Sequence, residues 1–399
     1  MIRPVSGFAR TPGTVMTRRE ALAAAAGGIV LASCGESFGS LEPDAPEPPA
    51  FVKDPSHFIM HGSNLEARLE DMDGLLTPVD RFFVRNHSPT PIIDADAYRL
   101  SVGGPGAERE VELTLADLRT LPSHSVIAYL ECAGNWRRFF ESVLGQAAAG
   151  SQWGTGAIGC AEWSGPRLRD VLALAGLRPG AVDVNLHGLD DSAWQRPMPL
   201  AKAMDENTLL ALTMNGAPLH PDHGFPVRAL LPGWIGAASV KWLGRIEIAT
   251  GKVWVAANTT SYVLIGEHWP PADYAPASGA PIDQGAVKSA LALPLPARLS
   301  PGIHRLRGFA YSPHGPVARV EWNAGTTSAA GPWRDARLIG PRLPHAWSRF
   351  EFEWNAAPGN HVLRTRATDE TGLRQPAEAL YNAKGYLLNL ALPHPVAVE

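Results

Sequence analysis

Alternating hydrophobic and polar positions mark the last third of the chain. Residues 305–310 alternate between two faces, and so do residues 350–354, where Phe350, Phe352 and Trp354 are separated by glutamates. Residues 361–367 repeat the pattern and end at a turn-forming stretch, 369–372. Short two-sided strands at regular spacing are typical of a β-sandwich. We therefore expect a sandwich domain over residues 280–399.

The preceding part of the chain mixes both periodicities. Residues 115–121 and 167–175 have helical spacing, and Gly176 follows the second as a stop signal. Apolar runs at 126–130 and 182–186 predict strands. Strands and helices do not alternate regularly, so a doubly wound parallel sheet is disfavoured. The pattern predicts an α+β domain over residues 57–275.

Composition narrows the class of protein. The 399 residues are 45% hydrophobic and 19% charged, which suits a globular core, and 36 Pro and 39 Gly favour turns. A formal net charge of -4 argues against nucleic acid as a partner. Three cysteines, Cys34, Cys132 and Cys160, are too few for a disulfide framework.

The first 35 residues have the pattern of an export signal. Arg18-Arg19 precedes an uncharged run, 21–33, that is too short to span a bilayer. A twin arginine favours Tat export and a periplasmic location. Leu31 to Gly35 resembles a lipobox that would lipidate Cys34 and tether the protein to a membrane, whereas in a plain cleaved signal Cys34 is incidental. Residues 36–56, rich in proline, predict a linker.

Cys132 is the sharpest chemical candidate. It follows an apolar strand in the segment Glu131-Cys132-Ala133-Gly134-Asn135-Trp136-Arg137-Arg138. A thiolate is a soft ligand for a transition metal, and neighbouring guanidinium groups favour the thiolate and attract anions. The structural alternative is a buried cysteine with no ligand.

Two further segments concentrate polar groups. Phe82 to His87 reads as a core strand that ends in Arg85, Asn86 and His87, which can hold an anion or a polar cofactor or simply cap the strand. Residues 223–242 combine His223, Arg228 and Lys241 with small residues that let the backbone approach a ligand. These cations suit a phosphate group, although a lone histidine is more often structural.

Together these segments resemble the sulfite oxidase family of molybdopterin oxidoreductases. The likeness continues through 153–159, 163–165 and 168–172, and residues 367–372 resemble the C-terminal domain of bacterial members related to sulfane dehydrogenase. It covers about Phe58 to Asn389 in the same order. The resemblance implies a molybdopterin domain followed by an immunoglobulin-like β-sandwich that mediates dimerisation.

The resemblance also implies residue roles. Cys132 would be the only protein ligand of molybdenum, Arg85, Arg137 and Arg349 would line the substrate pocket, and Tyr262 would be the active-site tyrosine. Trp136 and Lys288 depart from the family, whose better-known members carry a basic residue and Gln there. The positions that match the pterin-binding set are Phe83, Val84, Arg85, Asn86, His87, Asp190, His223, Arg228, Ser239, Val240 and Lys241.

The implied reaction is oxidation of sulfite to sulfate by oxygen-atom transfer, with one molybdenum per chain. No CxxCH segment occurs, so we expect no haem c in this chain and an external c-type cytochrome as electron acceptor. Alternatives are a sulfane-type dehydrogenase subunit that acts on protein-bound sulfur and an exported binding lipoprotein with an immunoglobulin-like domain. A zinc hydrolase is disfavoured because no HExxH occurs.

Overall fold

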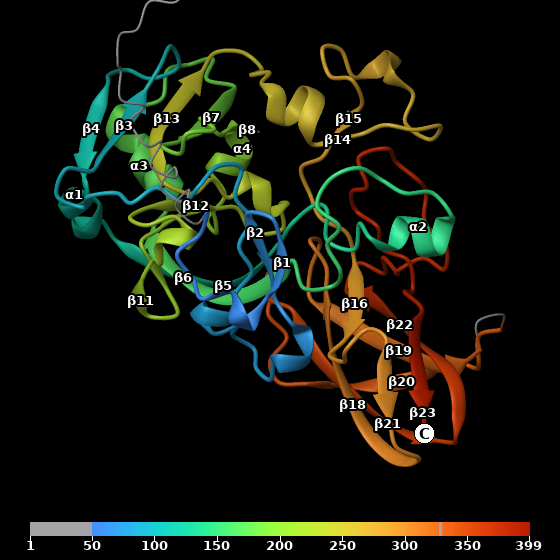
Figure 1. The fold of residues 1–399 in the computed structure, drawn as a ribbon. Helices are drawn as coiled ribbons and strands as arrows, with labels where there is room; N and C mark the ends of the chain where they lie inside the picture. The colour runs from blue at the N-terminus through green and yellow to red at the C-terminus, as the bar shows by residue number, and fades with distance from the viewer. Residues whose placement is uncertain (1–49, 327–328) are drawn as a thin grey trace, which may run out of the picture. The chain divides into compact units, whose positions relative to one another are not determined.

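The computed structural model describes residues 50–326 and 329–399 (Figure 1). The described residues belong to one compact unit. The predicted export signal, Cys34 and residues 36–49 of the predicted linker lie outside the described residues. Among the described residues, no helix is long and apolar enough to cross a membrane.

The described end of the predicted linker belongs to the folded body. The backbone amide of Lys53 donates to the Asp222 carboxylate at 2.8 Å, and the side chain of Phe51 is buried. Residues 50–56 are therefore not a free tether, because a buried carboxylate anchors their backbone.

A five-stranded sheet with the order β4-β3-β13-β7-β8 forms the first layer of the α+β part. Only the β13–β3 pair is parallel within this sheet, which agrees with the absence of a doubly wound pattern. The strands are β3 (Arg99–Gly103), β4 (Val111–Thr114), β7 (Asp183–Gly188), β8 (Gln195–Pro199) and β13 (Leu243–Ala249).

Helices α1 (Leu115–Thr120) and α3 (Leu168–Ala175) pack their apolar residues against this sheet, in a core that joins Leu118 and Leu172 to Leu100 and Leu186. A capping box formed by Thr114 and Asp117 starts α1. Gly176, at φ 72°, ends α3 in the left-handed region that favours glycine. Both helices and the strands predicted at 126–130 and 182–186 are confirmed within a few residues.

A second sheet, β11-β10-β6-β5, carries the strand that leads to Cys132. Its strands are β5 (Ser123–Glu131), β6 (Ile158–Pro166), β10 (Thr213–Met214) and β11 (Ala217–Pro218). Smaller pairs are β1 (Ile59–His61) with β2 (Asn64–Glu66), β9 (Leu209–Ala211) with β12 (Arg228–Leu230), and β14 (Val263–Leu264) with β15 (Ala280–Pro281). This part also contains the helices α2 (Phe139–Leu144) and α4 (Leu200–Ala203). Its short helical turns are Pro55–His57, Leu69–Asp71, Val79–Arg81, Pro221–His223, Gly236–Ala238, Ala257–Ser261 and Pro271–Asp273.

The C-terminal part is the predicted β-sandwich. Its strands follow the order β16-β18-β21-β20-β19-β22-β23-β17, and β20 joins the two layers by pairing with both β21 and β19. The inward positions, such as Leu306, Trp322 and Phe350, form its own core. The bounds are β16 (Lys288–Leu291), β17 (Ala297–Leu299), β18 (Gly302–Tyr311), β19 (Val317–Gly325), β20 (Arg334–Ile339), β21 (Ser348–Ala356), β22 (Gly359–Asp369) and β23 (His394–Val398).

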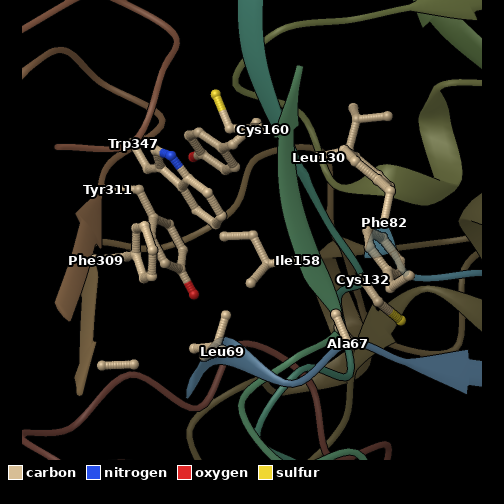
Figure 2. Close-up of a cluster of buried hydrophobic side chains, with 14 of the residues drawn as sticks. Ala67, Leu69, Phe82, Leu130, Cys132, Ile158, Cys160, Phe309, Tyr311 and Trp347 are labelled. Atoms are coloured by element: carbon tan, nitrogen blue, oxygen red, sulfur yellow. The ribbon is translucent and has the colours of Figure 1, made fainter. Parts of the chain in front are cut away.

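A second core cluster joins the sandwich to the β5–β6 hairpin. Phe309, Tyr311 and Trp347 of the sandwich lie on one side of the strand ribbon in Figure 2, and Leu130 and Phe82 lie on the other. Cys132 lies at the edge of this cluster, next to Phe82. The end of β5 is therefore fixed from both sides.

Candidate functional site

The turn after β5 holds Cys132 on the wall of a cavity. The amide of Cys132 donates to the Ala157 carbonyl at 2.9 Å, and the Cys132 carbonyl accepts from the Asn135 amide at 2.8 Å. A Cβ atom on Gly134 would lie 2.5 Å from the Arg137 guanidinium, so glycine lets Arg137 keep this close position over the turn. The sequence thus places a thiol on a tight loop between two hydrogen-bonded strands.

The cavity is an open cleft of about 700 Å³, solvent space included. Cys132 and ten of the predicted pterin-binding residues line it, together with Tyr262. The predicted residues on its wall are Phe83, Arg85, Asn86, His87, Cys132, Asp190, His223, Arg228, Ser239, Val240, Lys241 and Tyr262. Segments that are up to about 180 positions apart in the chain therefore meet at one site.

Two cations of this wall are deeply buried. Burial holds the pKa of Lys241 well below its usual range, and the charge of Arg228 lowers it further. Burial also lowers the pKa of Arg228 to about 9. The Lys241 ammonium donates to the Asn86 side-chain oxygen and, at 2.9 Å, to the Asp222 carbonyl. Burying positive charge in this way is costly unless an anion compensates it.

Some polar atoms at the same wall have no partner in the described residues. The buried Nε2 of His223 and Nε of Arg228 accept or donate no hydrogen bond. Burial, with the charges of Lys53 and Arg228, holds the pKa of His223 well below its usual range, so the imidazole is neutral. Unsatisfied buried groups next to cations fit a site for an anionic, hydrogen-bonding group such as a pterin phosphate.

Aromatic rings also line the cavity. His87 stacks on Trp194, with 4.2 Å between ring centroids, and its Nε2 lies 3.4 Å from the Tyr262 hydroxyl. Burial and the Arg85 charge lower the pKa of His87 to about 3, so this ring is neutral. Burial raises the pKa of Tyr262, which keeps the phenol protonated. Both groups can therefore serve as neutral hydrogen-bonding partners.

Arg137 lies beside the cavity rather than on its wall. Its Nε donates to the Lys384 carbonyl at 3.1 Å and its Nη1 to the Ser151 carbonyl at 3.0 Å. Arg85 likewise donates to oxygens of Asn86 and Asn64. Within the described part of the chain, neither arginine forms an ion pair with a carboxylate. Two uncompensated guanidinium groups near Cys132 favour an anion site.

Two predicted site residues lie elsewhere. Val84 packs into a small core with Phe51 and Leu65. Arg349 lies on β21, opposite Phe309 and Ile339, and its guanidinium is next to Gly340. Arg349 is not among the residues that line the cavity, and it alternates with the inward-facing Phe350, so its place in the pocket stays a prediction.

The structure adds residues that sequence reasoning missed. Trp194 and Asp222 line the cavity. Tyr386 stacks on Tyr262, with 5.3 Å between ring centroids and 14° between ring planes, and its ring centroid lies 4.9 Å from the Arg137 guanidinium carbon. Asp222 could have been found beside His223, whereas Tyr386 lies some 120 residues after Tyr262 and carries no motif.

Three features of the cavity indicate which kind of cofactor it can hold. Among the described residues, no three His, Cys, Asp or Glu side chains gather as a metal site. Cys132 offers one soft ligand to a transition metal, whose other ligands a cofactor would supply. The buried cations, the unpartnered polar atoms and the thiol together fit a molybdenum–pterin group.

Comparison with known proteins gives the same result. Residues 87–253 match the oxidoreductase molybdopterin binding domain. The chain is 35% identical to mitochondrial sulfite oxidase of Rattus norvegicus over 339 residues, 79% of this chain and 60% of the relative. It is 36% identical to sulfite oxidase of Gallus gallus over 335 residues, 78% of this chain and 71% of the relative.

The fold has a solved counterpart. The structure of the sulfane dehydrogenase SoxCD from Paracoccus pantotrophus matches with a TM-score of 0.73 and 27% identity, over 87% of this chain and 88% of that one. The chain spans 60% of the length of the rat relative. A thiol after β5, a cationic cavity behind it and the conserved order of both parts place this chain in the sulfite oxidase family of molybdopterin oxidoreductases.

Proposed function

We propose that the protein oxidises sulfite to sulfate. The observation that carries this proposal is the pair Arg85 and Arg137, which lie near Cys132 without a carboxylate partner in the described residues. Such a pair concentrates a small dianion next to the thiol. The net reaction adds one oxygen atom from water to sulfite and releases two electrons and two protons.

In this proposal each group of site residues has a separate role. When bound, the molybdenum cofactor supplies oxygen-atom transfer and two-electron chemistry. Cys132 holds the metal through its thiolate, and Lys241, Arg228 and His223 hold the pterin phosphate. Arg85 and Arg137 bind and orient the oxyanion, while the neutral Tyr262 phenol donates a hydrogen bond to it. We expect one molybdenum per chain.

Replacement of Cys132 by Ser tests the assignment. Serine is nearly isosteric but a poor ligand for a soft metal, so we expect Cys132→Ser to lose sulfite oxidation at least 100-fold. Cys160→Ser is the matched control, because Cys160 is buried in the core near the Trp347 backbone amide and does not line the cavity. Near-wild-type turnover by Cys132→Ser, per molybdenum, would contradict the assignment.

A second candidate substrate is a sulfur group bound to a carrier protein. The likeness to the sulfane dehydrogenase over 88% of its chain favours this possibility. The two functions are distinguished by assaying the molybdenum-loaded protein with sulfite and with a persulfide on a small carrier peptide. Turnover of the peptide without turnover of sulfite would favour the dehydrogenase.

We also propose export to the periplasm and transfer of electrons to an external c-type cytochrome. Arg18-Arg19 ahead of an uncharged run supports Tat export, and the absence of CxxCH supports an external acceptor. Fractionation of cells that express Arg18→Lys/Arg19→Lys tests the export. A Soret band in the purified chain would contradict the external acceptor.

We propose that the sandwich forms a homodimer. A monomer in ultracentrifugation at micromolar concentration would contradict this proposal.

A further inference from the structure

The segment from Asn382 to Leu387 is built against the Cys132 loop. The Asn382 amide group donates to the Tyr386 carbonyl at 2.8 Å, and the Tyr386 amide donates to the Asn382 side-chain oxygen at 3.0 Å. The Leu387 amide donates to the Ala133 carbonyl at 3.0 Å. In Figure 1 this C-terminal chain runs beside α2. Tyr386 therefore has a fixed backbone at the site.

The Tyr386 ring covers the Arg137 guanidinium. Its centroid lies 4.9 Å from the guanidinium carbon, and a Cβ atom on Gly385 would lie 2.8 Å from Cγ of Arg137. The same ring also stacks on Tyr262, which lines the cavity. Tyr386 thus connects a residue of the cavity wall with the arginine beside it.

The chemical nature of the group that contacts Arg137 determines how much of its charge remains available to an anion. A carboxylate would orient Arg137 but would also neutralise it, in competition with any anion. An aromatic face holds a guanidinium by a cation–π interaction and leaves its full charge and its free N–H groups available. The backbone carbonyls of Lys384 and Ser151 fix the remaining orientation in the same charge-preserving way.

We propose that Tyr386 is a positioning residue that orients Arg137 for a small tetrahedral oxyanion. This inference rests on the proposed function of the same site and identifies the residue that determines its anion affinity. Tyr386 acts through Arg137 and Tyr262, and it contacts the Arg137 guanidinium with both its ring face and its hydroxyl, which accepts a hydrogen bond from it. The expected consequence is on binding of the anion much more than on the rate of the bound complex.

The test compares variants of the molybdenum-loaded protein with sulfate as the probe. Tyr386→Leu removes the ring, and Tyr386→Phe keeps it. Tyr381→Leu is the control from the position just before the segment, where the tyrosine packs on Phe140. Calorimetry measures the Kd of sulfate, and steady-state kinetics measure KM and kcat for sulfite per molybdenum.

We expect Tyr386→Leu to weaken sulfate binding and raise KM about 5- to 30-fold, the range of a desolvated cation–π contact, with kcat changed less than threefold. Tyr386→Phe, which keeps the ring and loses only the hydroxyl contact with Arg137, should have a smaller effect than Tyr386→Leu, and Tyr381→Leu should leave the Kd unchanged. If Tyr386→Leu is insoluble, Tyr386→Met replaces it. A wild-type Kd in the ringless variant, or the same loss in Tyr381→Leu, would overturn the inference.

The proposed function and the positioning role of Tyr386 can be disproved independently of each other. If the wild type binds sulfate and Tyr386→Leu does not, but sulfite is not oxidised, the positioning role stands and the proposed substrate is wrong. If sulfite is oxidised while Tyr386→Leu keeps a wild-type KM and Kd, the proposed function stands and Tyr386 has no such role. A wild type that binds no sulfate overturns the positioning role outright.

Discussion

Arg137 and Arg138 are neighbours in the chain with opposite environments. Arg137 is 6% exposed, bonded to two backbone carbonyls and covered by Tyr386, whereas Arg138 is exposed beside Phe139. Fixed, buried charge acts on a bound anion far more strongly than mobile charge in water. At the scale of the residue, environment rather than residue type distinguishes a binding group from a surface group.

This contrast gives a matched pair of substitutions. We expect Arg137→Gln to raise KM for sulfite at least tenfold, because it removes a preorganised charge, and Arg138→Gln to change it less than twofold. The wild-type KM should also rise with added sulfate, which competes for the same site. Equal kinetics in the two variants would show that Arg137 does not contact the substrate.

The buried Lys53 predicts how the stability of the protein depends on pH. Burial lowers the pKa of Lys53 to about 7, and its ammonium donates to the carbonyls of Val79 and Phe82. The unfolded chain, with a lysine pKa near 10.4, binds more protons than the folded chain between the two values. Stability should therefore rise as pH increases from about 7 toward 10.

Urea unfolding at several pH values in this window measures the effect. The denaturation midpoint of the wild type should rise with pH more steeply than that of Lys53→Met, in which the titrating group is absent. Parallel pH profiles of the two proteins would mean that Lys53 is not desolvated as the structure has it.

The sequence predicted the residues of the cavity better than the residues beside it. Cys132, Arg85 and Lys241 stand in local segments whose composition predicts a polar ligand, so their position at a cavity could be inferred without coordinates. Arg349 was expected at the cavity and does not line it, and Tyr386 was missed, for one reason. Which part of a late segment folds back onto an early loop depends on tertiary packing, and no local pattern records it.

At the scale of the element, strands of the sandwich hold the end of β5. Oε1 of Glu131, the residue before Cys132, accepts from Lys288 on β16 at 2.7 Å, from Tyr311 on β18 at 2.8 Å and from Asn135 at 2.9 Å. Lys288 is fully buried, and its ammonium lies 5.2 Å from the Trp136 ring. Lys288 therefore touches the Cys132 loop on both sides of the thiol.

Removing one partner of the buried Lys288–Glu131 pair should destabilise the protein strongly, whereas replacing both partners should change its stability little. Lys288→Met should destabilise the protein by about 3–5 kcal/mol, because it leaves the Glu131 carboxylate buried and without its cation. The double variant Lys288→Met/Glu131→Gln should recover most of that stability, since the amide oxygen still accepts from Tyr311 and Asn135. Urea unfolding of the four proteins of this cycle measures the coupling.

Two outcomes of that cycle are informative. Recovery of stability without recovery of sulfite turnover would show that the buried charges also orient the loop for its function. Additive effects of the single substitutions would show that the two groups do not interact, contrary to the 2.7 Å contact.

The elements themselves were predicted where periodicity is strong. Alternation in 305–310 and 350–354 corresponds to the long strands β18 and β21, and the helices at 115–121 and 167–175 correspond to α1 and α3. Two-residue strands such as β10 and β14 were not predicted, because a pattern of period two cannot be recognised over two residues. Short strands of this kind form only through their tertiary partners.

At the scale of the whole molecule, the predicted boundary near residues 275–280 does not separate two independent cores. The sandwich has one core of its own, yet Phe309, Tyr311 and Trp347 belong to the cluster of Tyr129, Cys160 and Trp163. Hydrogen bonds reinforce this shared cluster: the Trp347 indole donates to the Leu75 carbonyl at 2.7 Å, and the Tyr129 amide donates to the His345 carbonyl at 2.9 Å.

The shared cluster leads to a prediction about folding. A fragment of residues 50–281 lacks Trp347, Tyr311 and Lys288, so it would expose a large apolar surface and leave Glu131 buried without its cation. A fragment of residues 282–399 keeps its own core and should fold, whereas the first fragment should not. The full chain should unfold in one transition whose calorimetric and van't Hoff enthalpies agree. Separate transitions of the full chain, or a cooperatively unfolding 50–281 fragment, would show instead that the sandwich is a removable addition and that the Cys132 site is complete without it.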